Sequence, residues 1–316
     1  MRRLLGALGA AFAVAGCTAP PPPAAPEAAE PPSPTATTTP ASAASALLVA
    51  AGDISCRPRQ RADEEGGCAQ RTTADLVVGL KPTAVLALGD TQYDDGSPEE
   101  YASYDASWGR FKDVTLPVVG NHEYQTPDAK GYYAYFGDRA GDPTQGWYAT
   151  SIGAWRVIVL NSECAEIGGC DPGSPQGRWL SSQLSDSPQC TLAAYHRPRF
   201  SSGAEHGDDP SLNALWAELH DGGVDVVLNG HDHDYERFAP RNADGGVGSG
   251  PVQFVVGTGG HSLRGFSRAD RGSEVRWADS VGVLALTLRP GGYDWRFVGP
   301  DGAPPVDSGT GTCREQ

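Results

Sequence analysis

The stretch Ala84-Val-Leu-Ala-Leu-Gly-Asp-Thr-Gln-Tyr93 decides the fold, because an apolar run of strand length leads directly into residues that bind metals. Strands of a parallel sheet that are buried on both faces read as continuous apolar runs. Ligands of such sheets bind just beyond the carboxyl ends of the strands. The stretch therefore predicts a buried strand that delivers Asp90 and Tyr93 to a binding site.

Four other apolar runs end in the same way. The residues that follow them are Asp53; Asn121, His122 and Glu123; His196; and His231, Asp232 and His233. Glycine precedes most of these blocks, which permits sharp turns and a close approach of the backbone. On an extended chain, His231 and His233 would point their rings to the same side. We therefore expect side chains from five strand ends to form one site.

Composition limits the classes of function. The 316 residues carry a formal net charge of −15 and are 39% hydrophobic, enough for a sizeable core. A basic nucleic-acid-binding surface is not expected for such a chain. The acidity does not exclude a phosphate substrate, because bound cations dominate the local field at a metal site.

The first 17 residues predict an export leader. A basic Met1-Arg-Arg3 precedes an apolar run, and Val14-Ala-Gly-Cys17 matches a bacterial lipobox whose cysteine carries the lipid. The run is too short for a membrane-spanning helix. An ordinary cleaved leader with an incidental cysteine is the alternative. Residues 18–45, rich in Pro, Ala and Thr, predict a linker, either a tether or a plain tail. Residues 46–316 are then the catalytic domain.

Six cysteines remain once Cys17 is set aside. An even number in an exported chain favours three disulfides, although six cysteines allow 15 pairings. We favour the pairing that joins sequence neighbours first: Cys56 with Cys68, Cys164 with Cys170, and Cys190 with Cys313. Thiolate ligation of a metal is disfavoured because no Cys-x-x-Cys spacing occurs.

Strands and helices alternate in the first part of the chain, and hairpins follow. Besides the strand-end runs, strands are expected at 155–161, 252–257, 281–288 and 293–298, and helices at 71–80, 98–108, 176–184 and 212–220. Ser97 would cap the second of these helices, and residues 124–147 read as a loop. The fold class is α/β of mixed α+β type: two packed mixed β-sheets flanked by helices, an αββα sandwich.

The residue types at the strand ends suit metal ions. Carboxylates such as Asp53 and Asp90 are hard oxygen ligands, and one carboxylate can bridge two cations. Asn121 offers a neutral oxygen, and the imidazoles of His196, His231 and His233 suit Zn, Fe or Mn. Four of the 7 histidines lie in the strand-end blocks, which scattered core histidines would not do.

These blocks resemble the metallophosphoesterase (calcineurin-like) superfamily, and more narrowly its purple acid phosphatase-like branch. The resemblance rests on Gly52-Asp53, Gly89-Asp-Thr-Gln-Tyr93, Gly120-Asn-His-Glu123, Tyr195-His196 and Gly230-His-Asp-His233, and spans roughly residues 46–300. Many members carry Asp-x-His at the first block, where this chain has Ser55. In the purple acid phosphatases, a tyrosine at the position that corresponds to Tyr93 takes the place of that histidine. The alternative for Tyr93 is an aromatic side chain that packs in a loop.

The resemblance implies two metal ions. Metal one would be held by Asp53, Asp90, Tyr93 and His233, and metal two by Asp90, Asn121, His196 and His231. A phenolate favours Fe(III) at metal one, while Fe, Zn or Mn(II) would occupy metal two. Two such cations clamp a phosphate, and a bound cation activates water as hydroxide near neutral pH. The resemblance assigns phosphate binding and leaving-group protonation to His122.

Several other residues near these blocks are candidates for the site on weaker grounds. His206 lies ten residues after His196, where plant-type members carry a substrate-contacting histidine; a surface role is the alternative. For His261 we favour a structural role, and for His220 a helix C-terminal cap beside Asp221. Arg197 and Arg199 are candidates for either phosphate contact or the surface.

The sequence thus predicts an exported, lipid-anchored phosphatase that hydrolyses phosphate monoesters. The alternatives are a phosphodiesterase or nucleotidase with the same site, and a noncatalytic surface lipoprotein. The expected partners are a small phosphate ester and, through Cys17, a membrane. The natural substrate, the second metal and the oligomeric state stay open.

Overall fold

The structure is a computed structural model that describes residues 45–58, 67–185, 190–300 and 305–314, together with residues 13 and 16. Its contacts separate residues 1–41 from residues 42–316, and the fold below is that of the second unit. Apart from residues 13 and 16, the predicted leader with Cys17 and residues 18–44 of the predicted linker lie outside the described residues. No helix in the described part is long and apolar enough to cross a bilayer.

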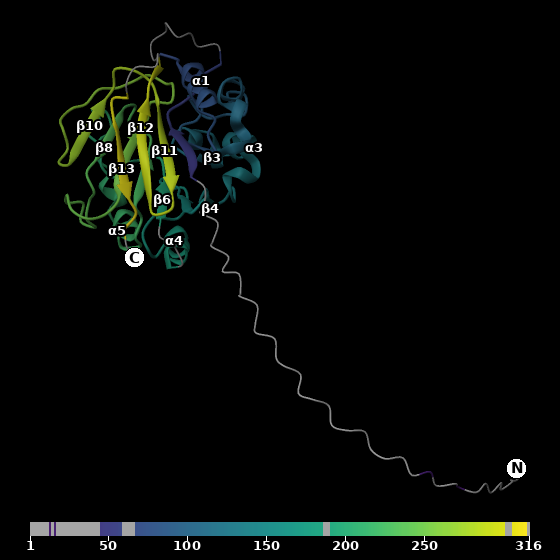
Figure 1. Cartoon of the computed structure of the whole chain (residues 1–316). Coiled ribbons are helices and arrows are strands. Elements are labelled where there is room, and N and C mark those ends of the chain that lie inside the picture. The colour runs from purple at the N-terminus through teal and green to yellow at the C-terminus, as the bar shows by residue number, and fades with distance from the viewer. Residues whose placement is uncertain are drawn as a thin grey trace, which may run out of the picture. The chain divides into compact units, whose positions relative to one another are not determined.

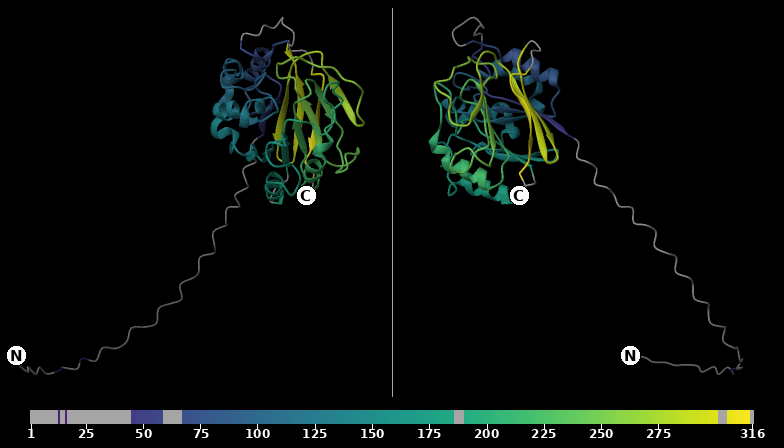
Figure 2. Two further views of the ribbon diagram at one scale, coloured as in Figure 1. Left: turned by 180° about the vertical axis from the view of Figure 1, so that it is seen from behind. Right: turned by 60° about the vertical axis from the view of Figure 1, so that its left-hand side comes forward.

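Two mixed sheets organise the described residues (Figures 1 and 2). The first has the order β13–β12–β11–β1–β2–β3, with β1 Ala46–Ala51, β2 Ala84–Leu88, β3 Thr115–Val118, β11 Val283–Arg289, β12 Gly292–Val298 and β13 Ser308–Thr312. The second has the order β10–β8–β9–β7–β6–β5–β4, with β4 Tyr148–Ile152, β5 Trp155–Val159, β6 Cys190–Ala194, β7 Val226–Asn229, β8 Tyr235–Phe238, β9 Val252–Val256 and β10 Ser273–Trp277.

Parallel pairing in each sheet brings the site residues to one edge. β1, β2 and β3 are parallel neighbours in the first sheet, and β5, β6, β7 and β9 are parallel neighbours in the second. Most of these strands are apolar and almost wholly buried, as their sequences predicted. The carboxyl ends of both parallel sets therefore lie where a site can form.

Helices cover the sheets in a four-layer arrangement. The described helices are α1 Gln70–Leu80, α2 Tyr101–Asp105, α3 Lys130–Phe136, α4 Pro175–Ser185 and α5 Asn213–Asp221. Leu180 of α4 and Trp216 of α5 pack on Ile158 and Val227 of the seven-stranded sheet. Val77 of α1 and Phe136 of α3 belong to the main core with the six-stranded sheet. The predicted αββα sandwich is confirmed.

Two local predictions were wrong. The helix expected at 98–108 is only the short α2, followed by a 3-10 segment at Trp108–Val114, and Ser97 is not its cap. Ser97 instead forms a turn, accepting from the N–H groups of Glu100 and Tyr101. The expected loop at 124–147 contains α3, because Tyr132 and Phe136, four residues apart, are both buried.

The favoured disulfide pairing is confirmed. Cys56 bonds to Cys68, Cys164 to Cys170, and Cys190 to Cys313. The last bond joins the start of β6 to the residue after β13, across 123 positions of sequence. It therefore links the second sheet to the C-terminal edge strand of the first. Of the three disulfides it closes the longest loop, so it restricts the unfolded chain most.

Candidate metal centre

The strand-end residues of both sheets meet at one place. Asp53 follows β1, and Asp90 and Tyr93 follow β2, while His196 follows β6 and His231 follows β7. Two hydrogen bonds tie the sheets together here: Gly52 N–H donates to the Val256 carbonyl at 2.8 Å, and His196 Nδ1 lies 2.8 Å from the Leu88 carbonyl. The site is therefore shared by two sheet edges rather than by one.

Three of the candidate ligands have left-handed backbones. Asp53, Asp90 and His231 have φ values of 58°, 45° and 73°. Such angles are strained for non-glycine residues and persist at sites where the surroundings fix them. The expectation that His231 lies on extended chain was wrong, because the segment between β7 and β8 is bent. The bend still brings His233 to the site and turns Asp232 toward the N–H of Gly207.

The first group of donors surrounds the Tyr93 hydroxyl. This oxygen lies 2.9 Å from Asp53 Oδ1, 3.1 Å from Asp90 Oδ2 and 3.0 Å from His233 Nε2. His233 Nε2 also lies 3.4 Å from Asp53 Oδ1. All four side chains are buried. They are the four residues expected at metal one.

The second group shares Asp90 with the first. His196 Nε2 lies 3.2 Å from Asp90 Oδ2, 3.2 Å from Asn121 Oδ1 and 3.2 Å from His231 Nδ1. Asp90, His196 and His231 offer ligand atoms that all lie within 4.8 Å of one another. These are the four residues expected at metal two, so the structure brings all seven predicted ligands together.

In His196 and His233, Nδ1 contacts a backbone carbonyl, so Nε2 is the nitrogen that faces the cluster. His196 Nδ1 faces the Leu88 carbonyl, and His233 Nδ1 lies 2.6 Å from the Ser262 carbonyl. A carbonyl accepts a hydrogen bond, so each Nδ1 donates its N–H to the backbone, and Nε2 is the nitrogen that would face a bound cation. Histidine ligands of metals are held in this way. The donor set therefore fits two cations that share Asp90.

Electrostatics also favour a cation. Burial alone lowers the pKa of His196, but the neighbouring Asp90 outweighs it and raises the pKa to about 10. Burial would raise the pKa of Asp90, yet His196, His122 and His231 together hold it well below its ordinary value. Burial and the carboxylates of Asp53 and Asp90 raise the pKa of Tyr93. The buried carboxylates thus retain a proton on His196, a charge that a cation would replace.

Two glycines permit the candidate ligands to pack close to the backbone. A Cβ on Gly89 would lie 2.4 Å from His196 Nδ1, and a Cβ on Gly120 would lie 2.3 Å from Asp90 Oδ1. Gly89 also has a φ of +85°. The glycines were expected to allow a close approach, and at these two positions a side chain would displace candidate ligands.

Three further histidines border the cluster. The backbone N–H of His122 donates to Asp90 Oδ1 at 2.9 Å, and its Nε2 lies 3.9 Å from Asp90 Oδ2. The His206 ring stacks on His231 with 4.1 Å between centroids. The His261 ring stacks on Tyr93 at 4.0 Å, which agrees with a structural role.

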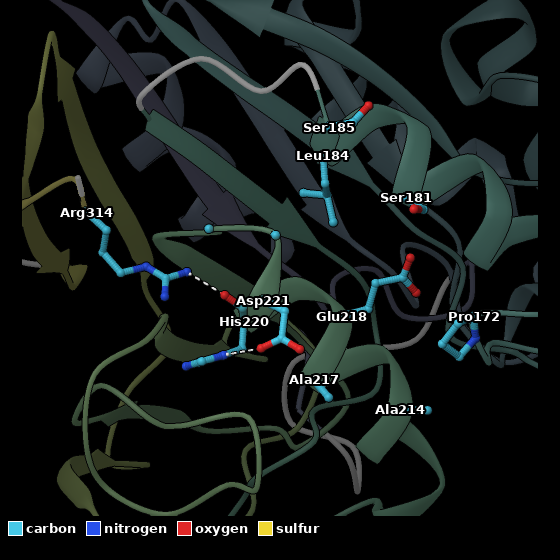
Figure 3. Close-up of a pocket in the computed structure, with 12 residues that line it drawn as sticks. Pro172, Ser181, Leu184, Ser185, Ala214, Ala217, Glu218, His220, Asp221 and Arg314 are labelled. Carbon is cyan, nitrogen blue, oxygen red and sulfur yellow. Dashed lines mark hydrogen bonds and ion pairs between the residues drawn. The ribbon is translucent and has the colours of Figure 1, made fainter. Parts of the chain in front are cut away.

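Other candidates lie elsewhere. Arg199 Nε donates to Asn213, and its Nη1 pairs with Asp208 at 3.9 Å, so these partners are not candidate ligands. His220 lies in the last turn of α5 and contacts Asp221 and the Ser249 carbonyl, whereas the helix C-cap is Gly222. Asp221 and His220 also line a cavity of about 1000 Å³ between α4 and α5 (Figure 3), whose described lining includes none of the predicted site residues.

Sequence reasoning quoted Glu123 but gave it no role. Its buried carboxylate accepts from the N–H groups of Asp90, Thr91 and Gly120 at 3.0, 2.7 and 2.7 Å, and from the Thr91 hydroxyl at 2.8 Å. Glu123 therefore fixes the loops after β2 and β3 against each other. Its position three residues after Gly120 was visible, but the sequence did not show that it faces inward.

Comparison with known proteins identifies the family of the chain. The family model described as "Calcineurin-like phosphoesterase" matches residues 47–235, more than half of the chain. The chain therefore belongs to the calcineurin-like phosphoesterase family. The family implies phosphoesterase chemistry at a dinuclear metal site, in agreement with the two donor groups that share Asp90.

Within this family the chain resembles the purple acid phosphatase branch. It is 28% identical over 222 residues to purple acid phosphatase 1 of Ipomoea batatas, covering 58% of this chain and 45% of the relative. It is 25% identical over 273 residues to a nucleotide pyrophosphatase/phosphodiesterase of Hordeum vulgare, covering 70% of each. The chain spans about half the length of the first relatives.

Solved structures share the fold, among them a plant enzyme. The purple acid phosphatase PPD1 of Lupinus luteus superposes with a TM-score of 0.74 at 19% identity, covering 85% of this chain and 54% of that one. At this identity the likeness supports the fold alone. The two mixed sheets with flanking helices are therefore the architecture of a purple acid phosphatase.

Proposed function

We propose that this chain is a metallophosphatase that hydrolyses phosphate monoesters. The observation that carries the proposal is the position of Asp90, whose carboxylate lies within 3.2 Å of both the Tyr93 hydroxyl and His196 Nε2. Metal one would be held by Asp53, Asp90, Tyr93 and His233, and metal two by Asp90, Asn121, His196 and His231. The phenol of Tyr93 supports Fe(III) at metal one, with Fe, Zn or Mn(II) at metal two.

Each residue at the site has its own role in the proposed hydrolysis. When bound, two adjacent cations supply positive charge to the phosphoryl oxygens and lower the pKa of water. Asp90, which contacts a member of each donor group, would serve both metal positions. His122 Nε2, on a side chain about one-quarter exposed, holds the proton that the departing alcohol oxygen receives. His206, stacked on His231, faces the substrate. Hydrolysis adds one water across the phosphorus–oxygen bond and releases the alcohol and phosphate.

The relative from Hordeum vulgare favours a second candidate, a phosphodiesterase or nucleotidase with the same metals. Its name gives nucleotide pyrophosphatase and phosphodiesterase activity, and it matches more of this chain than the relative from Ipomoea batatas. Rates on bis-aryl and mono-aryl phosphates distinguish the two candidates, because a diester has no terminal phosphoryl group.

For localisation, we propose export with a lipid on Cys17. The three disulfides support an oxidising compartment, and the lipobox spelling of residues 14–17 supports the anchor. Labelling with a palmitate analogue tests the anchor against an ordinary cleaved leader, with Cys17→Ser as the control.

Substituting His196 or Asn121 by alanine tests the function. Each change removes one donor of metal two, and we expect kcat/KM on an aryl phosphate to fall at least about 100-fold, as when one transition-state stabiliser is lost. Turnover equal to that of the unaltered chain, with the metals still bound, would defeat the proposal. His220→Ala is the matched control, because His220 lies outside the cluster.

A further inference from the structure

The cavity between α4 and α5 is built from the carboxyl ends of both helices (Figure 3). Its volume of about 1000 Å³ is large enough for a small organic molecule. The last turns of the two helices contribute to its lining: Leu184 and Ser185 from α4, and Glu218 and Asp221 from α5. The carboxyl end of a helix carries partial negative charge, so two such ends in one cavity favour a cation.

Glu218 is an acidic group of this cavity that lacks a partner. Its Oε2 atom is shielded from solvent and has no hydrogen-bond partner among the described residues. In Figure 3 the side chain extends from α5 toward α4. Burial raises the pKa of Glu218, and no neighbouring charge offsets that effect. Because a buried carboxylate without a partner is costly, this oxygen is available to a positively charged ligand.

The chain itself places one cation at this end of α5. Arg314 Nη2 donates to the carbonyls of His220 and Val224 at 3.1 and 2.6 Å, and Figure 3 draws the first of these bonds. Asp221 pairs with His220 Nδ1 at 2.8 Å. Neither Arg314 nor His220 contacts the Glu218 carboxylate, so both leave that charge without a counterion.

The lining favours an organic ammonium ion over a metal ion. Leu184, Ala214 and Ala217 are apolar and can contact a hydrocarbon chain. Ca²⁺ takes about 6–8 oxygen ligands, and Mg²⁺ needs octahedral geometry. Among the described residues, a cluster of three acidic, histidine or cysteine ligands occurs at the metal centre and not in this cavity. An alkylammonium ion needs one carboxylate and an apolar wall, which the cavity provides.

We propose that the cavity between α4 and α5 binds a linear primary amine. The ammonium group pairs with the Glu218 carboxylate, and the hydrocarbon chain lies along Leu184 and Ala217. The net charge of −15 draws cations toward the protein, and the two helix ends and Glu218 retain them here. The described lining contains no candidate metal ligand, so this inference does not depend on the proposed phosphatase function.

Calorimetry with n-hexylamine and 1-hexanol tests the site, because the two probes share a hydrocarbon chain and differ in charge. We expect the purified protein to bind one hexylamine per chain, at least about tenfold more tightly than hexanol. Glu218→Gln should weaken hexylamine binding about 10–100-fold, the worth of a charge-assisted hydrogen bond. Glu99→Gln is the matched control, because it makes the same change of charge on an exposed side chain outside the cavity.

A second variant locates the bound amine. Ala217→Leu fills the cavity while keeping the Glu218 charge, and should abolish hexylamine binding. Thermal unfolding checks the fold: Glu218→Gln should melt at the temperature of the unaltered protein, since its carboxylate has no partner to lose. Saturating hexylamine should raise the Tm of the unaltered protein but not that of Glu218→Gln. Absence of hexylamine binding, equal affinity for hexanol, or full affinity in either Glu218→Gln or Ala217→Leu would overturn the inference.

Discussion

Asp90→Asn is expected to lower kcat/KM on an aryl phosphate by about 10⁴-fold or more, because it weakens both halves of the site at once. Asp90 is the residue common to the two donor groups, and it is almost fully buried. An amide keeps the shape of the side chain but has no charge and only one oxygen. We expect the metal content to fall from two ions per chain to fewer than one, as measured by elemental analysis of the dialysed protein.

Asp225→Asn is the matched control for this prediction. Asp225 is also a buried aspartate, but it accepts from the N–H groups of Thr191 and Arg314, away from the metal centre. We expect this variant to keep its metals and its kcat/KM while losing some stability. If Asp90→Asn retained two ions and full turnover, Asp90 would not bridge the site.

Glu123→Ala is expected to lower the free energy of unfolding by about 3–5 kcal/mol, because each buried N–H that loses its acceptor costs about 1–3 kcal/mol. The N–H groups of Asp90, Thr91 and Gly120 would all lose their shared carboxylate. Because the loop after β2 carries Asp90 and Tyr93, metal affinity should fall together with stability. Urea unfolding followed by tryptophan fluorescence measures the first effect, and metal titration the second.

Two variants set the scale for Glu123. Glu123→Gln keeps one oxygen acceptor and should lose clearly less than the alanine variant. Glu274→Ala removes an exposed carboxylate that pairs with Arg237, and should change stability by less than about 1 kcal/mol. A Glu123→Ala protein as stable as the Glu274→Ala protein would mean that the Glu123 carboxylate does not hold the loops.

The fold and the ligands could be predicted because both follow from local patterns. Apolar runs such as Ala84–Leu88 are buried on both faces, and their carboxyl ends place ligands at a sheet edge by geometry. The short helix α3 escaped notice because tyrosines and glycines resemble a loop until Tyr132 and Phe136 are seen to pack. The bend at His231 depends on its positive φ, and no sequence pattern around His231 predicts that angle.

The role of Glu123 was missed because it depends on long-range contacts. Glu123 accepts from the N–H of Asp90 across 33 positions of sequence and from that of Thr91 across 32. Neither spacing carries a periodic signal, since the contacts arise only when the loops after β2 and β3 fold against each other. The metal ligands could be predicted because each lies shortly after one of five strands.

Anomalous diffraction from crystals of the purified, metal-loaded protein tests most directly whether seven side chains hold a pair of cations. We predict two peaks about 3.5–4 Å apart with the Asp90 carboxylate between them. Tyr93 and His233 should contact one peak, and His196 and His231 the other. A single peak, peaks outside this cluster, or no peak in a protein that still hydrolyses phosphate esters would contradict the account.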